Sequence, residues 1–204
     1  MTRSHDERCK ECKANVGRLL AVRFGAVKTN CDLHISSRLE DYKNSGLSDV
    51  LSSIYSSLQR HRGFENFIRS KKLKPVDFYL PEKSLIVEFD ESQHFTKARE
   101  IALSLYPQNC EFGFSVDRWR MLCQKLDKRD NDPPFRDEQR SWYDTLRDFA
   151  PLLSGIGKTI RLYSRDLVWC SLKLDNESDF LAFDRLFHQL LAAGNDDDGQ
   201  LRAS

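Results

Sequence analysis

Residues 76–94 read VDFYLPEKSLIVEFDESQH, and this stretch decides the fold. Two apolar runs, residues 76–80 and 85–90, are separated by the turn-forming residues 81–84. Because side chains alternate along a strand, each run places apolar side chains on one face and acids on the other. The stretch therefore predicts an antiparallel hairpin with one apolar face and one acidic face.

Three carboxylates share the acidic face of this hairpin. Asp77 lies in the first run, and Glu88 and Asp90 lie in the second. If Leu80 and Leu85 close the turn, Asp77 is directly opposite Glu88, with Cβ atoms about 4.5–5.5 Å apart. Like charges at that spacing destabilise a sheet unless a positive charge lies between them, and a divalent ion such as Mg²⁺ supplies one. A solvated face neutralised by side chains is the alternative, for which the nearby cations are Lys83, Lys97 and Arg99.

Gln93 and His94 follow the second strand and add an amide and an imidazole at its end. Such groups can orient or deprotonate a water molecule beside a metal ion. A lone histidine at this place is more often structural.

These residues together carry a resemblance to a known family. The segments Asp77-Phe-Tyr-Leu-Pro, Leu85-Ile-Val-Glu88-Phe-Asp90 and Gln93-His94 resemble the core of the PD-(D/E)XK nuclease superfamily. They are most similar to its branch related to the very-short-patch-repair endonucleases. The similarity spans roughly residues 47–172 and is dense over 76–95.

The resemblance implies an α/β fold with a restriction-endonuclease-like core, in which helices flank a central mixed β-sheet. It also implies hydrolysis of DNA phosphodiester bonds with Mg²⁺ or Mn²⁺, in repair, restriction or a mobile element. Asp77 and Glu88 would be metal ligands, and Asp90 a further ligand or a residue that orients water. Gln93 and His94 would position the nucleophile or the scissile phosphate.

Three positions depart from the family pattern. Val76 stands where the family has proline, Asp90 where it has lysine, and Glu91 where the branch has glycine. Asp90 removes a cation that would stabilise developing charge. This favours the alternative of a non-catalytic nucleic-acid-binding or assembly protein that keeps the nuclease fold.

A cysteine pattern near the N-terminus predicts a zinc site. Cys9 and Cys12 form CxxC, and Cys31 and His34 form CxxH after an 18-residue spacer. Two such turns can complete a tetrahedron around Zn²⁺, and a site closed by four protein ligands stabilises a fold rather than catalysing. The spacer residues 18–24 have the composition of a strand. The alternative is a pair of ordinary buried residues and a free cysteine pair.

Residues 60–74 predict a basic strand and loop suited to a phosphate backbone. Residues 1–75 carry 15 Lys and Arg against 8 Asp and Glu, although the whole chain has a net charge of +1. A solvated edge strand and a binding site for an acidic protein are the alternatives. Arg140 and Arg161 are read either as DNA contacts or as paired structural arginines. The candidate DNA-binding residues are Arg60, Arg62, Arg69, Lys71, Lys72 and Lys74.

The remaining pattern predicts alternating helices and strands. Helices are expected near residues 47–61, 97–106, 116–129 and 137–150, with a last helix ended by Gly194. A strand pair is expected near 158–163 and 166–172. The predicted organisation is a zinc-binding module at residues 1–45, a nuclease domain at 46–193 and a disordered acidic tail at 194–204.

Length and composition agree with an ordered domain. The chain has 204 residues, 40% of them hydrophobic, which excludes overall disorder. No apolar run approaches the roughly 18 residues that a membrane span needs. The six cysteines suit a reducing compartment better than a disulfide framework. The sequence therefore predicts a soluble, cytoplasmic protein with DNA as its partner and no membrane association.

Overall fold

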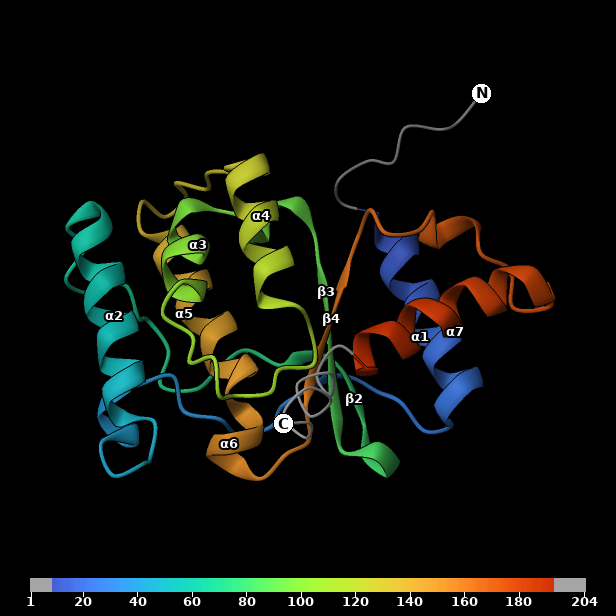
Figure 1. Cartoon of the computed structure of the whole chain (residues 1–204), viewed down its shortest axis with the longest axis horizontal. Coiled ribbons are helices and arrows are strands. Elements are labelled where there is room, and N and C mark those ends of the chain that lie inside the picture. Colours follow the sequence, from blue (N-terminus) through green and yellow to red (C-terminus); the bar gives the residue numbers. More distant parts are fainter. Residues whose placement is uncertain (1–8, 193–204) are drawn as a thin grey trace, which may run out of the picture.

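The computed structural model describes residues 9–192 and contains a mixed four-stranded β-sheet between two layers of helices (Figure 1). The first two neighbouring pairs of strands in the sheet are antiparallel, and the third pair is parallel. This confirms the predicted α/β class with a central mixed sheet. In sheet order, the strands are β1 (Lys28–Cys31), β2 (Val76–Leu80), β3 (Leu85–Asp90) and β4 (Thr159–Tyr163).

Five helices cover one face of the sheet and two cover the other (Figure 1). The larger layer contains α2 (Ser48–Arg62), α3 (Lys97–Leu103), α4 (Val116–Leu126), α5 (Arg136–Asp148) and α6 (Ala150–Ser154). The smaller layer contains α1 (Lys10–Phe24) and α7 (Glu177–Ala192). Short 3₁₀ turns are η1 (Leu39–Tyr42), η2 (Pro81–Lys83), η3 (Ser92–His94) and η4 (Trp169–Ser171).

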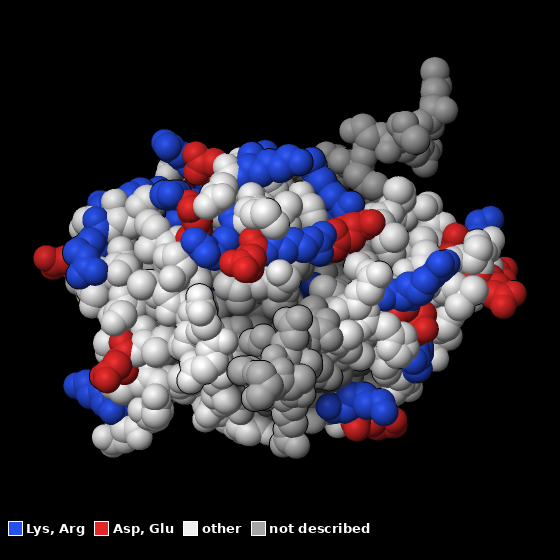
Figure 2. All heavy atoms as spheres, viewed as in Figure 1, with Lys and Arg blue, Asp and Glu red and all other residues white. Residues whose placement is uncertain are grey.

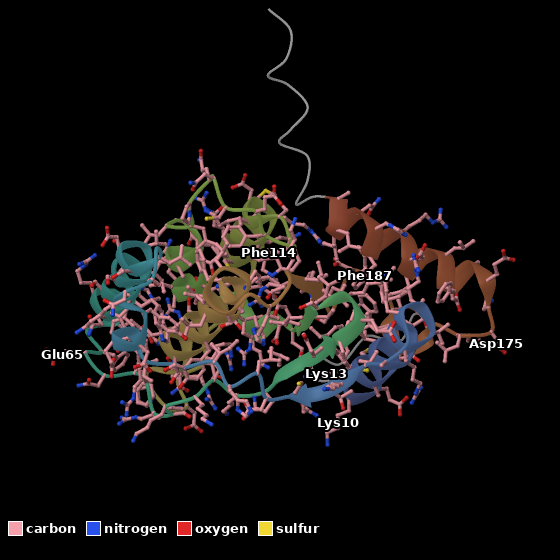
Figure 3. The ribbon with its side chains drawn as sticks, turned by 90° about the horizontal axis from the view of Figure 1, so that it is seen from below. Lys10, Lys13, Glu65, Phe114, Asp175 and Phe187 are labelled. Carbon is pink, nitrogen blue, oxygen red and sulfur yellow. The ribbon has the colours of Figure 1, made fainter. Side chains whose placement is uncertain are left out.

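Each face of the sheet has its own apolar core, because side chains alternate along the strands. Ile86 packs with the buried side chains of the α2–α6 layer. Its neighbour Val87 packs with those of α1 and α7. Figure 3 shows Phe114 and Phe187, one from each core, on opposite sides of the sheet.

The hairpin follows the predicted bounds and register. Phe78 pairs with Val87, and Leu80 pairs with Leu85 across the turn. Helices near residues 47–61, 97–106, 116–129 and 137–150 are also confirmed, within a few residues at their ends. Gly194, the expected end of the last helix, lies outside the described residues.

The turn of the hairpin packs against the loop before β4, at Gly157. A Cβ atom at Gly157 would lie 1.9 Å from the carbonyl oxygen of Ser84, which is backbone and cannot rotate away. We expect Gly157→Ala to lower the free energy of unfolding by roughly 1–3 kcal/mol, since the two loops must separate. Urea denaturation measures this, with Gly46→Ala as the control, because a Cβ there meets no atom within 4 Å. Equal stability of the two variants would contradict the close packing.

Residues 18–24 are helical, so the predicted strand at this place is wrong. They belong to α1, whose buried residues Cys12, Val16, Leu19 and Leu20 recur at helical spacing. The prediction considered only a short apolar run, and such a run does not separate strand from helix by itself.

The predicted strand at 166–172 is also absent from the described residues, where the chain forms a 3₁₀ turn at Trp169–Ser171. The side chain of Asn15 in α1 donates hydrogen bonds of 2.8 Å to the carbonyl oxygens of Trp169 and Leu172. The indole of Trp169 is buried and donates to the carbonyl oxygen of Tyr163. The Asn15 side chain therefore occupies carbonyl groups of this segment that a neighbouring strand would otherwise bind.

Residues 9–45 do not form a module of their own in the structure. β1 is the outer strand of the common sheet, and α1 packs on the same core as α7. The predicted tail at 194–204 lies outside the described residues. Within residues 9–192, no helix combines the length and apolar character that crossing a membrane requires.

Candidate functional site

The hairpin brings Asp77 and Glu88 together as the sequence predicts. The backbone N–H of Asp77 donates to Oε1 of Glu88 at 3.2 Å. The backbone N–H of Phe89 donates in turn to Oδ2 of Asp77 at 3.0 Å. The two carboxylates are thus fixed by the backbone of each other's strand, beside the start of β2.

Glu88 is a buried carboxylate whose charge is only partly neutralised. Its residue is 5% exposed, and burial raises the pKa of its carboxyl to about 7. The guanidinium of Arg147 opposes this rise, while the charge of Asp77 adds to it. Nε of Arg147 lies 3.4 Å from Oε1 of Glu88, but it is buried and has no hydrogen-bond partner. Among the described residues, no hydrogen bond reaches Oε2 of Glu88.

Lys13 supplies the cation nearest to Asp77. It comes from α1, in the opposite helix layer, and its ammonium pairs with Oδ1 of Asp77. The Lys13 side chain is 42% exposed and the Asp77 side chain 17% exposed, so this pair faces solvent. Figure 3 shows Lys13 and Lys10 beside each other at one edge of the molecule.

Asp90 differs from the other two acids, because it belongs to a buried ion pair. Arg161 of β4 donates to both of its carboxylate oxygens, at 2.8 and 3.0 Å. The indole of Trp119 donates a hydrogen bond to Oδ2 of Asp90 at 2.7 Å, and Asp90 is 1% exposed. These contacts give both carboxylate oxygens of Asp90 a protein donor, whereas Asp90 is expected from the sequence to bind the metal or orient water. They also place Arg161 as a structural arginine.

A layer of buried charge surrounds this pair between the sheet and α5. Asp148 accepts hydrogen bonds from Arg161 at 2.7 Å, from Tyr106 at 2.8 Å and from Arg99. Burial lowers the pKa of the Arg161 guanidinium, but Asp148, Asp90 and Asp144 outweigh this and hold its pKa well above the ordinary value. The sequence analysis does not predict this layer. The only sign of it in the sequence is the high density of charged residues in α5, a helix that is buried in the structure.

His94 and Gln93 are held by contacts to neighbouring side chains and backbone. Nδ1 of His94 is 3.0 Å from Oδ2 of Asp144, and the imidazole is 20% exposed. Burial lowers the pKa of His94, but the carboxylates of Asp144 and Asp90 outweigh burial and raise it. The side-chain amide of Gln93 donates a hydrogen bond to the carboxylate of Glu91 at 2.9 Å. The backbone carbonyl oxygen of Gln93 accepts a hydrogen bond from Arg140 at 2.8 Å.

The basic segment 60–74 forms the end of α2 and an exposed loop that leads into β2. Arg62 is not exposed like the other basic residues of this segment. Its guanidinium binds the buried carboxylate of Glu138 at 2.6 Å. This pair removes Arg62 from the candidate phosphate contacts. The loop ends at the site, since Arg147 donates to the carbonyl oxygen of Lys74 at 3.2 Å. The exposed basic residues of the segment are Arg60, Arg69, Lys71, Lys72 and Lys74.

The face shown in Figure 2 does not offer a continuous basic surface. Over α3 and α4, Lys and Arg alternate there with Asp and Glu (Figure 2). A cavity of about 750 Å³ opens between α2, α3 and the loop after α4. Both charge signs line it, including Lys97, Glu100, Arg129 and Asp137, whereas Asp77 and Glu88 are not among its lining residues.

The four predicted zinc ligands are not brought together. Cys31 packs with the core of the α2–α6 layer, whereas Cys9 and Cys12 pack with that of α1 and α7. His34 is exposed and its Nδ1 lies 3.3 Å from Asp32. Cys170 joins Cys9 and Cys12 instead, and these three can hold a metal ion such as zinc. The CxxC…CxxH set is therefore corrected, because the sheet separates its two halves.

Two carboxylate oxygens of this pair take no hydrogen bond from the backbone. Oε2 of Glu88 has no hydrogen-bond partner among the described residues, and Oδ1 of Asp77 pairs with the ammonium of Lys13. Carboxylate oxygens are the protein ligands that Mg²⁺ takes, together with waters and phosphate oxygens. Both oxygens of Asp90, by contrast, accept hydrogen bonds from buried donors.

Comparison with known proteins adds nothing to this geometry. No protein-family model matches the chain, and the searches of curated proteins and of solved structures return no match.

Proposed function

We propose that this chain is a metal-dependent DNA endonuclease whose site is the carboxylate pair Asp77 and Glu88. The observation that carries the proposal is the pairing itself: two acids on neighbouring strands, fixed by backbone hydrogen bonds, one of them buried without full neutralisation.

The resemblance to the PD-(D/E)XK superfamily supports the same assignment. That resemblance implies a central mixed sheet flanked by helices, with the acids on adjacent strands of a hairpin. The chain has a mixed sheet flanked by helices, and the hairpin register puts Asp77 opposite Glu88, which supports the proposal. The restriction-endonuclease-like form of the core is part of the proposal.

In this proposal, Asp77 and Glu88 would hold one Mg²⁺ or Mn²⁺ ion. A bound divalent ion lowers the pKa of a coordinated water and neutralises phosphate charge. Lys13 supplies the positive charge that the family pattern places two residues after the second acid, where this chain has Asp90. Its ammonium lies beside Asp77, so it is placed to stabilise charge on a phosphate oxygen.

His94 acts from the end of β3 in this proposal. Its Nδ1 is engaged by Asp144, which orients the ring and favours a proton on that nitrogen. Gln93 is held by Glu91 and Arg140, and it positions the backbone of the same turn. These two residues orient the nucleophile or the phosphate.

The exposed loop that leads into β2 supplies the DNA contact. Lys71 and Lys72 are exposed, and Lys74 lies one hydrogen bond from Arg147 beside the acids. A DNA strand whose phosphates bind along this loop would therefore reach Asp77 and Glu88. Lys10 lies on the same edge of the molecule as Lys13 and extends the positive surface (Figure 3).

We expect Lys71→Glu with Lys72→Glu to weaken binding to a DNA duplex at least about tenfold, since two phosphate contacts become repulsive. Fluorescence anisotropy at several salt concentrations measures this, and the slope of log affinity against log salt becomes shallower. The matched control reverses two exposed lysines elsewhere, Lys125 and Lys173. An equal loss in both double variants would show that overall charge, not this loop, sets the affinity.

Cleavage of supercoiled plasmid is the direct test of the proposed function. We expect nicked or linear product with Mg²⁺ or Mn²⁺ and none with EDTA. Full-length protein that binds DNA but leaves plasmid and linear substrates intact with both ions would overturn the endonuclease assignment.

A second function is favoured by one observation. Each predicted catalytic acid has a protein cation near it, namely Lys13, Arg147 or Arg161. A fold with internally neutralised acids suits a non-catalytic nucleic-acid-binding or assembly protein. Salt-dependent DNA binding with no cleavage would support this candidate.

A further inference from the structure

Three cysteine sulfurs from opposite ends of the chain meet beside the start of α1. Cys9, Cys12 and Cys170 each place Sγ within 4.8 Å of the other two. The spacing of the first two residues is visible in the sequence, but the third is contributed by η4, near the C-terminus. Cys12 directly precedes Lys13, which pairs with Asp77, but the metal assignment does not depend on the proposed nuclease activity.

The first turn of α1 sets the position of two of the sulfurs. Cys9 is the N-cap residue, and the backbone N–H of Cys12 donates to its Sγ at 3.2 Å. The N-terminal turn of a helix carries partial positive charge and favours thiolates. Cys12 is buried and Cys9 half-buried, so both face the protein interior rather than bulk water.

Buried contacts hold the third sulfur against this turn. Asn15 lies one turn further along α1, and its amide binds the carbonyl oxygens of Trp169 and Leu172, on either side of Cys170. Asn15 and Trp169 are both buried. Hydrogen bonds from Asn15 therefore hold the backbone around Cys170 against α1, while Cys170 itself is exposed.

Three thiols this close favour a cation between them. Zn²⁺ prefers thiolate ligands, and binding displaces their protons. The same preference excludes Mg²⁺, which takes oxygen ligands.

We propose that Cys9, Cys12 and Cys170 bind one Zn²⁺ ion as three thiolate ligands, with a fourth ligand from outside this group. The site joins the start of α1 to η4 and so ties the N-terminal helix to the segment that leads into α7. It replaces the set of Cys9, Cys12, Cys31 and His34 that the sequence spacing predicts.

The zinc content of the wild-type protein and of the Cys170→Ser and Cys31→Ser variants tests this assignment. Full-length protein purified in reductant without chelator is expected to contain about one equivalent of zinc by elemental analysis. Cys170→Ser is expected to lose most of it. Cys31→Ser, which removes a cysteine of the rival set, is expected to keep it. Retention by Cys170→Ser together with loss by Cys31→Ser would overturn the proposal, and so would a wild-type protein without zinc.

Cobalt substitution counts the thiolates directly. Co²⁺ added to the zinc-free protein is expected to give sulfur-to-cobalt charge-transfer bands and the visible bands of a tetrahedral site. With Co²⁺ in excess, so that the weakened site is also filled, the loss of one of three thiolates is expected to lower the charge-transfer absorbance by about a third. The absorbance of the Cys170→Ser protein is therefore lower than that of the Cys31→Ser protein by that fraction. Equal absorbance in the two variants would overturn the proposal. Cys170→His keeps a ligand and is expected to retain the metal, which separates ligand loss from unfolding.

Discussion

Asp77→Asn and Glu88→Gln are each expected to lower the rate of plasmid cleavage by more than about 100-fold, because each removes an anionic ligand from the proposed metal site. The side chains keep their size, so the hairpin keeps its register. For Glu88, the amide also avoids burying a charged group, and stability is expected to stay equal or rise. Cleavage rate and urea denaturation, measured on the same preparations, separate catalysis from folding.

The controls use the same changes at exposed acids. Asp117 is 87% exposed and Glu111 is 66% exposed, and neither approaches the carboxylate pair. Asp117→Asn and Glu111→Gln should cleave at the wild-type rate. If Asp77→Asn and Glu88→Gln also cleave at that rate, the proposed site is wrong even where the protein is a nuclease.

Arg161→Met is expected to produce the largest loss of stability, about 3–5 kcal/mol, because it breaks a buried ion pair by removing one partner. Its guanidinium contacts Asp90 and Asp148, and both carboxylates are at most 1% exposed. Methionine fills part of the volume but leaves Asp90 without its guanidinium partner and Asp148 with Arg99 alone as an ion-pair partner among the described residues. Urea denaturation at neutral pH measures the loss.

A half-exposed ion pair provides the control for the loss of stability expected of Arg161→Met. Arg118 pairs with Asp166, and its side chain is 37% exposed, so solvent screens the charges. Arg118→Met should cost less than about 1 kcal/mol. Equal losses for the two variants would mean that the buried layer contributes no more than a surface pair.

Local signals predicted the hairpin well. Alternation and the turn at residues 81–84 determine which side chains face each core, and the register that pairs Leu80 with Leu85 places Asp77 opposite Glu88. Helix α2 also follows directly from its apolar spacing. These features depend on residues close together in the chain.

Features that depend on contacts between residues far apart in the sequence were predicted less well. The strand expected at 166–172 is a 3₁₀ turn because Asn15, far away in sequence, takes its carbonyl groups. The third cysteine of the metal group was missed for the same reason. Asp90 was expected at the catalytic site, but Arg161 on β4 binds it.

The sequence by itself determined the α/β class, the hairpin and the facing pair Asp77 and Glu88, since these follow from alternation and one turn. Only the tertiary structure decided what neutralises each acid and which cysteines meet. Lys13 reaches Asp77 from another layer, Arg161 reaches Asp90 from the parallel strand, and Cys170 reaches Cys9 from the far end of the chain. Sequence periodicity describes one element at a time, whereas charge pairing and metal geometry depend on distances between elements.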